Sequence, residues 1–301
     1  MTSNNCKLPN LIIAGVHKAG TTSLYSYLGK HPQICPSFRK EIGFFVPLMF
    51  DREIPALEEY SKYFTHCGNE YFRMEASPSY LYGKEKIAEA IRKAIPDAKI
   101  IVILRDPTDR LLSFFSRAVS KSALPEDIGL NDYLSVSKQK INSAEHDVYS
   151  RGVREGLYIE YIRPWQRAFG HNMKVVFFDD LQQSALGLTK NICAWLGLDT
   201  TCLESQDFSV ENKTRQYRYR KLHRYVKDVY MKSEAFWREH YRLKQRLRNI
   251  YNMFNADAVS TLRTVDEAGI AKLRALYEPY NQELKVFLES NNYASLPRWL
   301  N

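Results

Sequence analysis

Short apolar runs alternate with amphipathic stretches along this chain. The runs are rich in β-branched and aromatic residues and end at turn or charged residues, as buried parallel strands do. They comprise residues 11–14, 100–104 and 175–178. The amphipathic stretches carry an apolar residue every three to four positions, which predicts helices at residues 84–95, 154–169, 185–196 and 267–290.

Strands and helices in alternation predict an α/β fold with three layers, in which helices flank a central, mainly parallel sheet. Ligands of such sheets bind at the carboxyl ends of the strands. A chain of 301 residues with 45% apolar content can bury one large core, so we expect a single domain over residues 1–301. Residues 213–255 are much more basic than the rest, which predicts a helical insertion or appendage within that domain.

The segment after the first apolar run indicates an anion site. Gly15 and Gly20 bound a basic loop, and apolar residues at helical spacing follow it, so a strand, a loop and a helix are expected. Backbone N–H groups and the helix dipole attract anions at a helix N-terminus. The two glycines have the spacing of a nucleotide-triphosphate P-loop, but Lys18 lies between them rather than after the second. The pattern therefore predicts a P-loop-like fold whose ligand is not ATP.

A second polar pair stands at the end of the middle apolar run. Arg105 follows that run directly, and Ser113 lies eight residues further on in a predicted helix. The planar guanidinium of arginine bonds two phosphate oxygens at once, so this pair could hold a phosphate. An internal salt bridge of Arg105 with Asp106 or Asp109 is the alternative. Arg110 is expected on the surface, at the start of the helix.

These segments, taken together, resemble the sulfotransferases that use 3′-phosphoadenosine 5′-phosphosulfate (PAPS). The likeness rests on the basic loop, on residues 31–34 and 40–45, and on the block from Lys99 to Ser113. It is strongest with the carbohydrate branch, which includes the heparan sulfate N- and O-sulfotransferases and their bacterial relatives. Residues 41–45, 75–80 and 212–215 stand in the order that this branch uses. The likeness covers most of residues 10–215.

The resemblance implies that PAPS is the donor, that PAP is the product and that no metal is needed. It places Lys18 and the loop amides on the 5′-phosphate, Arg105 and Ser113 on the 3′-phosphate, and a closing loop on the 5′-phosphate or the adenine side. The implied donor ligands are Lys18, Ala19, Gly20, Thr21, Thr22, Ser23, Arg105, Ser113, Lys213 and Arg215. Thr21 and Thr22 could instead be helix N-caps. Ala76 stands where the branch has a lysine, so we expect no donor contact from that segment.

Transfer of a sulfuryl group resembles phosphoryl transfer and depends on positioning and on cations near the leaving group, a role for Lys18. The acceptor must also lose a proton to a base. The resemblance implies that Glu41 is this base. His17, next to Lys18, is the rival.

The expected reaction is direct in-line transfer from PAPS to a hydroxyl, and in second place to an amine, of a saccharide or glycoconjugate. A P-loop kinase or NTPase and a non-catalytic polyanion-binding module are the alternatives. The net charge of +9 suits an anionic acceptor, although a neutral glycan or glycolipid is also compatible with it. No nucleic-acid-binding motif accompanies the charge, so nucleic acid is not expected as a partner. The basic tract 213–248 is either a solvated helical face, a glycan groove or a contact to an acidic membrane surface.

The cysteine pattern suggests neither a disulfide framework nor a zinc site. Five cysteines are an odd number and show no C-x-x-C spacing, so we expect all of them to be reduced. Reduced cysteines, together with the lack of an apolar leader or a membrane-spanning stretch, favour a cytoplasmic protein that contacts the membrane peripherally at most. They also favour a bacterial member of the branch, or else a shortened form of a longer protein.

Overall fold

The computed structural model describes residues 7–143, 146–208, 215–217, 256–258, 267–293 and 295–301. The chain divides into two compact units, one formed by Met1–Phe208 with Arg263–Asn301 and the other by Ser209–Leu262. In the second unit the described residues form an antiparallel pair, β6 (Arg215–Tyr217) and β7 (Ala256–Ala258). The rest of the predicted basic insertion, Lys213 included, lies outside the described residues.

The first unit is built on a five-stranded sheet with the order β2-β3-β1-β4-β5, and each neighbouring pair is parallel. The strands are β1 (Leu11–Gly15), β2 (Ile34–Pro36), β3 (Phe72–Ala76), β4 (Lys99–Leu104) and β5 (Met173–Phe177). All five residues of the central strand β1 are buried, as expected for a parallel strand covered on both faces. The predicted α/β class with a mainly parallel sheet is confirmed.

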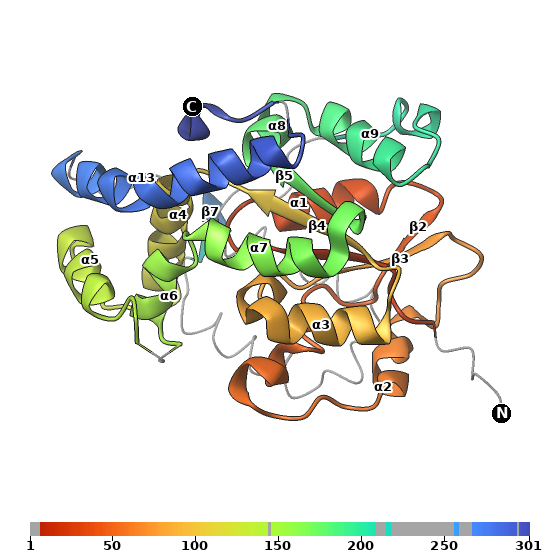
Figure 1. The fold of residues 1–301 in the computed structure, drawn as a ribbon, viewed down its shortest axis with the longest axis horizontal. Helices are drawn as coiled ribbons and strands as arrows, with labels where there is room; N and C mark the ends of the chain where they lie inside the picture. The colour runs from red at the N-terminus through yellow and green to blue at the C-terminus, as the bar shows by residue number, and fades with distance from the viewer. Residues whose placement is uncertain (1–6, 144–145, 209–214, 218–255, 259–266, 294) are drawn as a thin grey trace. The chain divides into compact units, whose positions relative to one another are not determined.

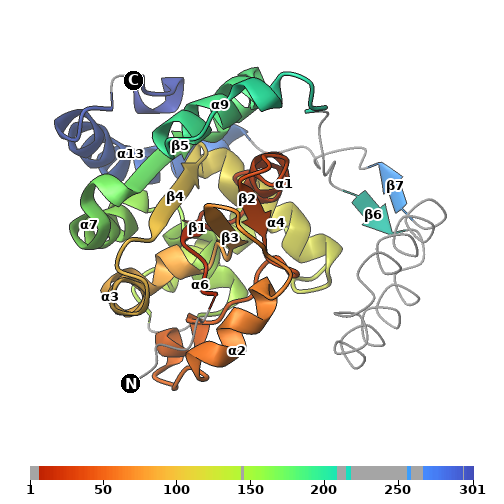
Figure 2. The ribbon, with the colours of Figure 1, turned by 90° about the vertical axis from the view of Figure 1, so that its right-hand side faces the viewer.

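Helices cover both faces of this sheet (Figures 1 and 2). α3 (Lys84–Ala94), α7 (Tyr158–Phe169) and α13 (Glu267–Ser290) lie on one face, while α1 (Thr21–Leu28) and α9 (Ala185–Trp195) lie on the other. The remaining α-helices are α2 (Leu57–Ser61), α4 (Pro107–Ser120), α5 (Leu130–Gln139), α6 (Val148–Arg154) and α8 (Phe178–Gln183). The 3-10 helices are η1 (Val46–Phe50), η2 (Lys62–Phe64), η3 (Tyr80–Gly83), η4 (Gly170–Asn172), η5 (Thr201–Leu203) and η6 (Arg298–Leu300).

The three predicted strands and the four helices predicted from periodicity are present, with small shifts at their ends. The helices expected after the basic loop and around Ser113 are present as α1 and α4. The largest shift is at the helix predicted from residue 154, where the chain forms α6, a break and then α7. Gly156 lies in this break because Tyr277 of α13 comes so close that a Cβ atom at position 156 would stand 2.7 Å from its ring. β2 and β3 were not predicted, because β2 has only three residues and β3 carries Arg73 and Glu75 among its apolar residues.

A disulfide joins Cys35 of β2 to Cys67, so the expectation that all cysteines are reduced is wrong. The two residues are 32 positions apart in sequence, but their Cα atoms lie 5.8 Å apart. The chain has to return to the edge strand β2 before it can enter the neighbouring strand β3, and this return brings Cys67 to Cys35. Cys193 and Cys202 are free. The inference from reduced cysteines to a reducing compartment therefore loses its premise.

None of the helices among the described residues has both the length and the apolar content that a membrane crossing requires.

Candidate active site

The loop between β1 and α1 has the backbone of an anion site. Gly20 is the N-cap of α1 at a φ of 84°, and a Cβ there would lie 2.8 Å from Leu181 and Phe178, so only glycine fits. The N-cap position is Gly20, so Thr21 and Thr22 stand at the first two helical positions and neither is the N-cap that the alternative required. The first amides of α1 therefore lie at the end of the central strand, where anions bind in such folds.

Lys18 lies half-buried in this loop with a φ of 69°. This left-handed conformation is costly for a residue with a side chain and occurs preferentially at functional sites. Burial, and after it the positive charges of Arg117, Arg105 and Lys121 in that order, lower the pKa of Lys18 to about 8. A cation surrounded by cations is stabilised by an anionic ligand, so the electrostatics of this loop suit a phosphate or a phosphosulfate.

Arg105 lies at the end of β4 beside the same loop. Its Nη1 donates to the carbonyl of Lys18 at 3.3 Å, and its guanidinium lies 4.8 Å from the centre of the Phe178 ring. Its Nη2 is 3.7 Å from Asp109, whereas Asp106 accepts from the amides of Thr108 and Asp109 as the N-cap of α4. Nε is buried without a hydrogen-bond partner. The alternative salt bridge thus exists with Asp109 alone, and it leaves one donor of Arg105 unused.

The other predicted donor ligands have mixed positions. Ser113 is half-buried on α4, Ala19 and Thr21 are buried, and Thr22 is exposed. Ser23 is half-buried at the start of α1. Arg215 lies in β6, where only the backbone is described, and Lys213 is outside the described residues.

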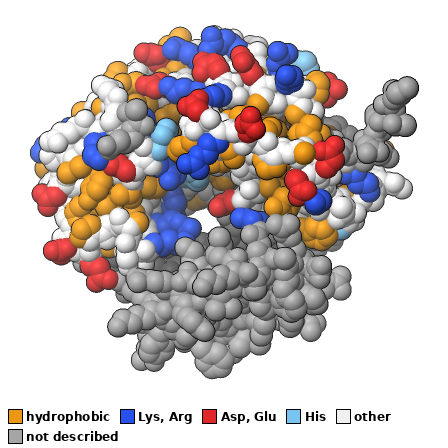
Figure 3. Space-filling model, turned by 90° about the horizontal axis from the view of Figure 1, so that it is seen from below, with side chains coloured by type: hydrophobic (Ala, Val, Ile, Leu, Met, Phe, Trp, Pro, Cys, Tyr) orange, Lys and Arg blue, Asp and Glu red, His pale blue; other side chains and the backbone are white. Residues whose placement is uncertain are grey.

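Two further cations near Lys18 were not predicted. Arg117 and Lys121 lie four and eight positions after Ser113, so the helical period of α4 could have placed them near it. Both residues are exposed and both affect Lys18. Figure 3 shows Lys and Arg side chains clustered on the face that is seen from below.

Glu41 lies in the loop after β2, and this loop is hydrogen-bonded to the end of β3. Its amide donates to the carbonyl of Ala76 at 2.9 Å, and its φ of 61° is again left-handed. The side chain is 63% exposed and pairs with Lys40 Nζ at 3.0 Å. Desolvation by the loop raises the pKa of Glu41, but the charges of Lys40, His17 and Arg117 outweigh it, so the pKa is lowered. Glu41 and His17 are thus electrostatic neighbours.

The loop that carries Glu41 is anchored to a buried carboxyl group. Ser77 Oγ accepts from the amide of Gly43 at 3.0 Å and donates to Glu75 at 3.5 Å, and the Tyr80 hydroxyl accepts from the amide of Phe45 at 3.4 Å. Glu75 is fully buried, and burial raises its pKa to about 7 against the influence of nearby hydroxyl groups. The segment around Glu75 therefore supports the loop of Glu41.

His17 contacts a carboxylate that the sequence analysis missed. Its Nδ1 lies 3.2 Å from Glu155 Oε2, and its ring stacks on Tyr82 with 5.2 Å between the ring centres. The backbone amide of His17 donates to the Tyr82 hydroxyl at 3.2 Å. The side chain of His17 is 24% exposed, whereas that of Glu155 is 5% exposed. An imidazole that reaches solvent is thus held by a buried acid.

Two arginines complete this buried cluster. Arg151 Nε donates to Glu155 at 2.7 Å, and Arg110 lies 3.6 Å from the same carboxylate. Arg110 is fully buried and also donates to the carbonyl of Gly152, so the expectation of a surface arginine is wrong. Position 110 faces α6 rather than solvent, because α4 packs against that helix. Burial raises the pKa of Glu155, but His17, Arg151 and Arg110 lower it to about 2.

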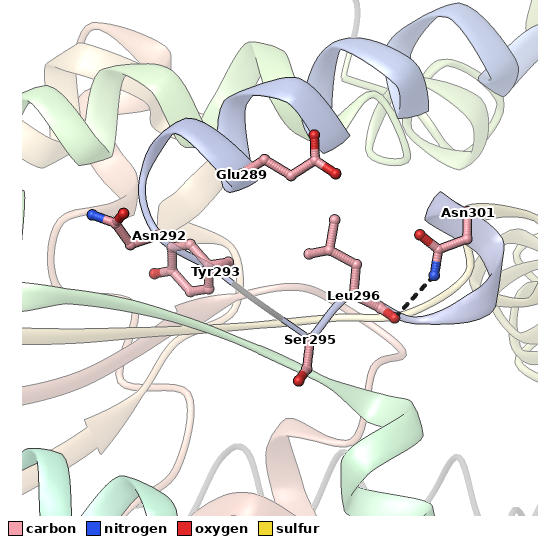
Figure 4. A pocket seen from close by; sticks show the side chains of 6 residues that line it. All are labelled: Glu289, Asn292, Tyr293, Ser295, Leu296 and Asn301. Atoms are coloured by element: carbon pink, nitrogen blue, oxygen red, sulfur yellow. Dashed lines mark hydrogen bonds between the residues drawn. The ribbon is translucent and has the colours of Figure 1, made fainter.

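The hollow shown in Figure 4 is not part of this site. It has a volume of about 800 Å³ and lies at the end of α13, where Glu289, Tyr293 and Asn301 line it. The Tyr293 hydroxyl there accepts from the amide of Val175 at 2.9 Å. None of the predicted site residues lines this hollow, so it does not bear on the chemistry.

Comparisons with known proteins agree with the geometry. The family model for the sulfotransferase domain matches residues 8–262. The mouse heparan sulfate glucosamine 3-O-sulfotransferase 3B1 is 29% identical over 194 residues, which are 64% of this chain and 47% of that protein. The human 3-O-sulfotransferase 3A1 is 26% identical over 277 residues, which are 91% of this chain and 59% of that protein. The chain thus spans about half the length of the curated relatives it matches.

A solved structure shows the same fold. The crystal structure of a sulfotransferase from Alicyclobacillus acidocaldarius superposes with a TM-score of 0.60 at 28% identity, over 68% of this chain and 87% of the other. A family model that spans most of the chain, and a solved relative with the same sheet, lead to one conclusion: this chain belongs to the sulfotransferase domain family.

Proposed function

We propose that this protein transfers the sulfuryl group of PAPS to a hydroxyl group, and in second place to an amine, of a saccharide or glycoconjugate by direct in-line transfer. The observation that carries the donor assignment is the meeting of Lys18 and Arg105 at the start of α1. Lys18 is a cation among cations, and Arg105 keeps a buried Nε without a partner. Both features suit a ligand with two separate anionic groups.

The donor fits these residues group by group. Lys18 and the first amides of α1 would hold the 5′-phosphosulfate, where negative charge grows on the leaving oxygen during transfer. Arg105 and Ser113 would hold the 3′-phosphate, because the guanidinium fork bonds two oxygens at once. Lys213 and Arg215 stay predicted ligands of the 5′-phosphate or the adenine side. PAPS supplies the activated sulfuryl group, and the protein supplies position and charge.

Two residues are candidates for the proton acceptor. Glu41 is the choice that the family resemblance favours, and in its left-handed loop it lies close enough to His17 for the two side chains to interact electrostatically. His17 is adjacent to Lys18 in the chain and therefore belongs to the donor loop itself. Either residue would take the proton of the acceptor as the new oxygen–sulfur bond forms.

The glycan class of the acceptor rests on the relatives. The mouse and human relatives act, by name, on glucosamine in heparan sulfate, and another relative, 38% identical over 109 residues, is the membrane-associated sulfotransferase kil1 of Dictyostelium discoideum. We propose that the acceptor is an anionic or neutral glycan or glycolipid. The basic tract 213–248 would contact either the glycan itself or an acidic membrane surface. A cytoplasmic location stays a prediction.

Donor binding and transfer are tested separately. PAP should raise the melting temperature of the protein by mass action, and ATP with magnesium should raise it much less. Equal stabilisation by the two nucleotides would favour a kinase or NTPase. Labelled PAPS is then offered with a panel of glycans, glycolipids and phenols. Binding of PAP without transfer to any saccharide would reject the proposed acceptor class but keep the donor.

The role of the basic tract has its own test. Exposed cationic contacts weaken as salt rises, so the KM for an anionic acceptor should increase with ionic strength more than the KM for PAPS. Replacing Arg238, Arg242, Arg246 and Arg248 by glutamine should flatten this salt dependence and spare PAP binding. An acceptor KM that ignores both salt and these four substitutions would show that the tract is a solvated surface.

A further inference from the structure

We infer that His17 takes the proton of the acceptor and that Glu155 is the positioning residue that holds the His17 imidazole in the tautomer this step requires. The inference rests on the proposed transfer from PAPS and adds to it a pair of residues from distant parts of the chain. His17 precedes Lys18 in the donor loop, and Glu155 follows the last residue of α6. Their separation is 138 positions in sequence and 3.2 Å in space.

Glu155 fixes the tautomer of His17. An ionised carboxylate can only accept hydrogen bonds. Glu155 is ionised because Arg110 and Arg151 flank it, so His17 Nδ1 must carry the proton that it donates to Oε2. Arg151 Nη2 lies 3.5 Å from the same nitrogen, a longer contact than that with the carboxylate. A neutral His17 with its proton on Nδ1 has a free lone pair on Nε2, which is what a general base needs.

Contacts with Tyr82 and Glu155 fix the orientation of the ring. Tyr82 of η3 stacks on the imidazole at an interplanar angle of 30° and also binds the backbone amide of His17. Glu155 cannot move to follow the ring, because Arg151 Nε donates to its other oxygen at 2.7 Å and the side chain is almost fully buried. The imidazole is thus fixed by contacts on one face and one edge, while part of it stays exposed. The charged and titratable groups around it are Glu155, Arg151, Arg110, Tyr82 and Glu41.

Glu41 and His17 have opposite partners: a lysine pairs with Glu41, and a carboxylate pairs with His17. Glu41 is paired with Lys40 at 3.0 Å and its side chain is largely exposed, and this pairing stabilises its ionised form. A carboxylate stabilised in this way is a weaker base than a free one. The partner of His17 is instead a carboxylate, Glu155. Its negative charge stabilises the imidazolium that forms when His17 accepts the proton. The electrostatic environment therefore favours His17.

The proposed step balances as follows. The acceptor oxygen forms a bond to sulfur while the bond from sulfur to the phosphate oxygen of PAPS breaks, and its electron pair stays on the phosphate of PAP. The acceptor proton moves to His17 Nε2. The imidazolium, with one proton on each nitrogen, then returns the Nε2 proton to solvent after the products leave.

The tautomer is tested first, without donor or acceptor. Protein labelled with 15N-histidine is measured by NMR, and the His17 signals are assigned by their loss in a His17→Asn variant. We expect the shift pattern of a ring protonated at Nδ1. Glu155→Gln should move the shift pattern towards a mixture of both tautomers. The control is Glu160→Gln, which removes a glutamate of α7 that pairs with Lys84 of α3 and should leave the pattern unchanged. This result does not depend on PAPS activity, so it separates this inference from the proposed function.

Kinetics then test whether Glu155 acts through His17. His17→Asn should lower kcat about 10²- to 10⁴-fold, the usual contribution of a general base, and leave PAP affinity unchanged within about twofold. Glu155→Gln should lower kcat at least tenfold in the native background and less than twofold in the His17→Asn background. Glu155→Asp keeps a negative charge beside the arginines but moves it away from His17. This variant replaces Glu155→Gln if the latter does not fold, and it should also lower kcat.

Three results would overturn the inference. The first is a His17 ring that carries its proton on Nε2 in the native protein. The second is a Glu155→Gln effect on kcat that is equally large with and without His17, because that result would assign Glu155 a structural role only. The third is a fully active His17→Asn variant beside an inactive Glu41→Gln variant, which would return the proton to Glu41.

Discussion

Arg105 and Lys18 are linked at the carboxyl ends of two adjacent strands: the Arg105 guanidinium donates to the Lys18 carbonyl at 3.3 Å. β4 ends one residue before Arg105, and β1 ends three residues before Lys18. The link brings together two parts of the predicted donor site that lie 87 positions apart in the sequence. The Phe178 ring lies next to both Gly20 and the Arg105 guanidinium, at the ends of the same two strands.

Loss of the Arg105 guanidinium should weaken PAP binding. Charged hydrogen bonds contribute about 1.5–3 kcal/mol, so Arg105→Ala should raise the Kd for PAP roughly 10- to 100-fold in a calorimetric titration. Asp109→Asn is the matched control, because it removes the ion-pair partner at 3.7 Å and keeps the guanidinium. The control should bind PAP at least as tightly as the native protein. Native affinity in Arg105→Ala would remove Arg105 from the donor site.

PAP binding should weaken as pH rises above about 8. Burial and three neighbouring cations lower the pKa of free Lys18 to about 8, and a bound phosphate raises it again because it favours the ammonium form. The favourable interaction is therefore complete below pH 8 and is lost as Lys18 deprotonates. We expect the affinity to fall about tenfold between pH 7 and pH 9.

The measurement is a titration with PAP at both pH values, and the control is Lys18→Met. The variant should bind more weakly at pH 7 and show a much flatter response between the two values. An unchanged pH response in Lys18→Met would mean that another group titrates.

Glu75 should make the protein less stable as pH rises through the range from 4.5 to 7. Its pKa is about 7 in the folded protein and 4.5 as a free side chain, so the folded state binds more protons in this range and stability falls as they leave. Glu75→Gln stays neutral at every pH. The free energy of unfolding of the variant, relative to the native protein, should therefore rise by about 2–3 kcal/mol between pH 5 and pH 8.

Urea unfolding at the two pH values measures this change. Glu89→Gln, on the exposed side of α3, is the control and should show no comparable difference. A Glu75→Gln variant whose relative stability is the same at both pH values would show that Glu75 is ionised in the fold throughout.

The disulfide should stabilise the fold by restricting the unfolded chain. It closes a loop over a sequence separation of 32, for which loop entropy predicts about 3–4 kcal/mol. Cys35→Ser should lower the free energy of unfolding by about 2–4 kcal/mol, and a phosphine reductant should lower that of the native protein by a similar amount. Cys202→Ser, which changes a free cysteine, should have less than about 1 kcal/mol of effect. No response to the reductant would contradict a disulfide in solution.

Local sequence determined the fold class and the loop between β1 and α1. The strands β1, β4 and β5 and the helices α3, α7, α9 and α13 follow from apolar periodicity, which is a property of neighbouring residues. The two glycines and Lys18 define the loop because a left-handed N-cap needs glycine and because phosphates need backbone amides. The strand β3 could not be predicted in this way, because in the sequence a glutamate such as Glu75 indicates an exposed position, although Glu75 is buried.

Only the tertiary structure decided which distant side chains meet. Arg110 has the sequence context of a surface residue at a helix start, yet it is fully buried on α4, which packs against both α6 and α13. Cys35 forms a disulfide with Cys67 because the chain returns to the sheet edge, and His17 contacts Glu155 although 138 positions separate them. No local pattern encodes these pairs, because burial and charge pairing depend on how whole elements pack. The sequence thus determined where an anion could bind, and the packing decided which acid supports the histidine beside it.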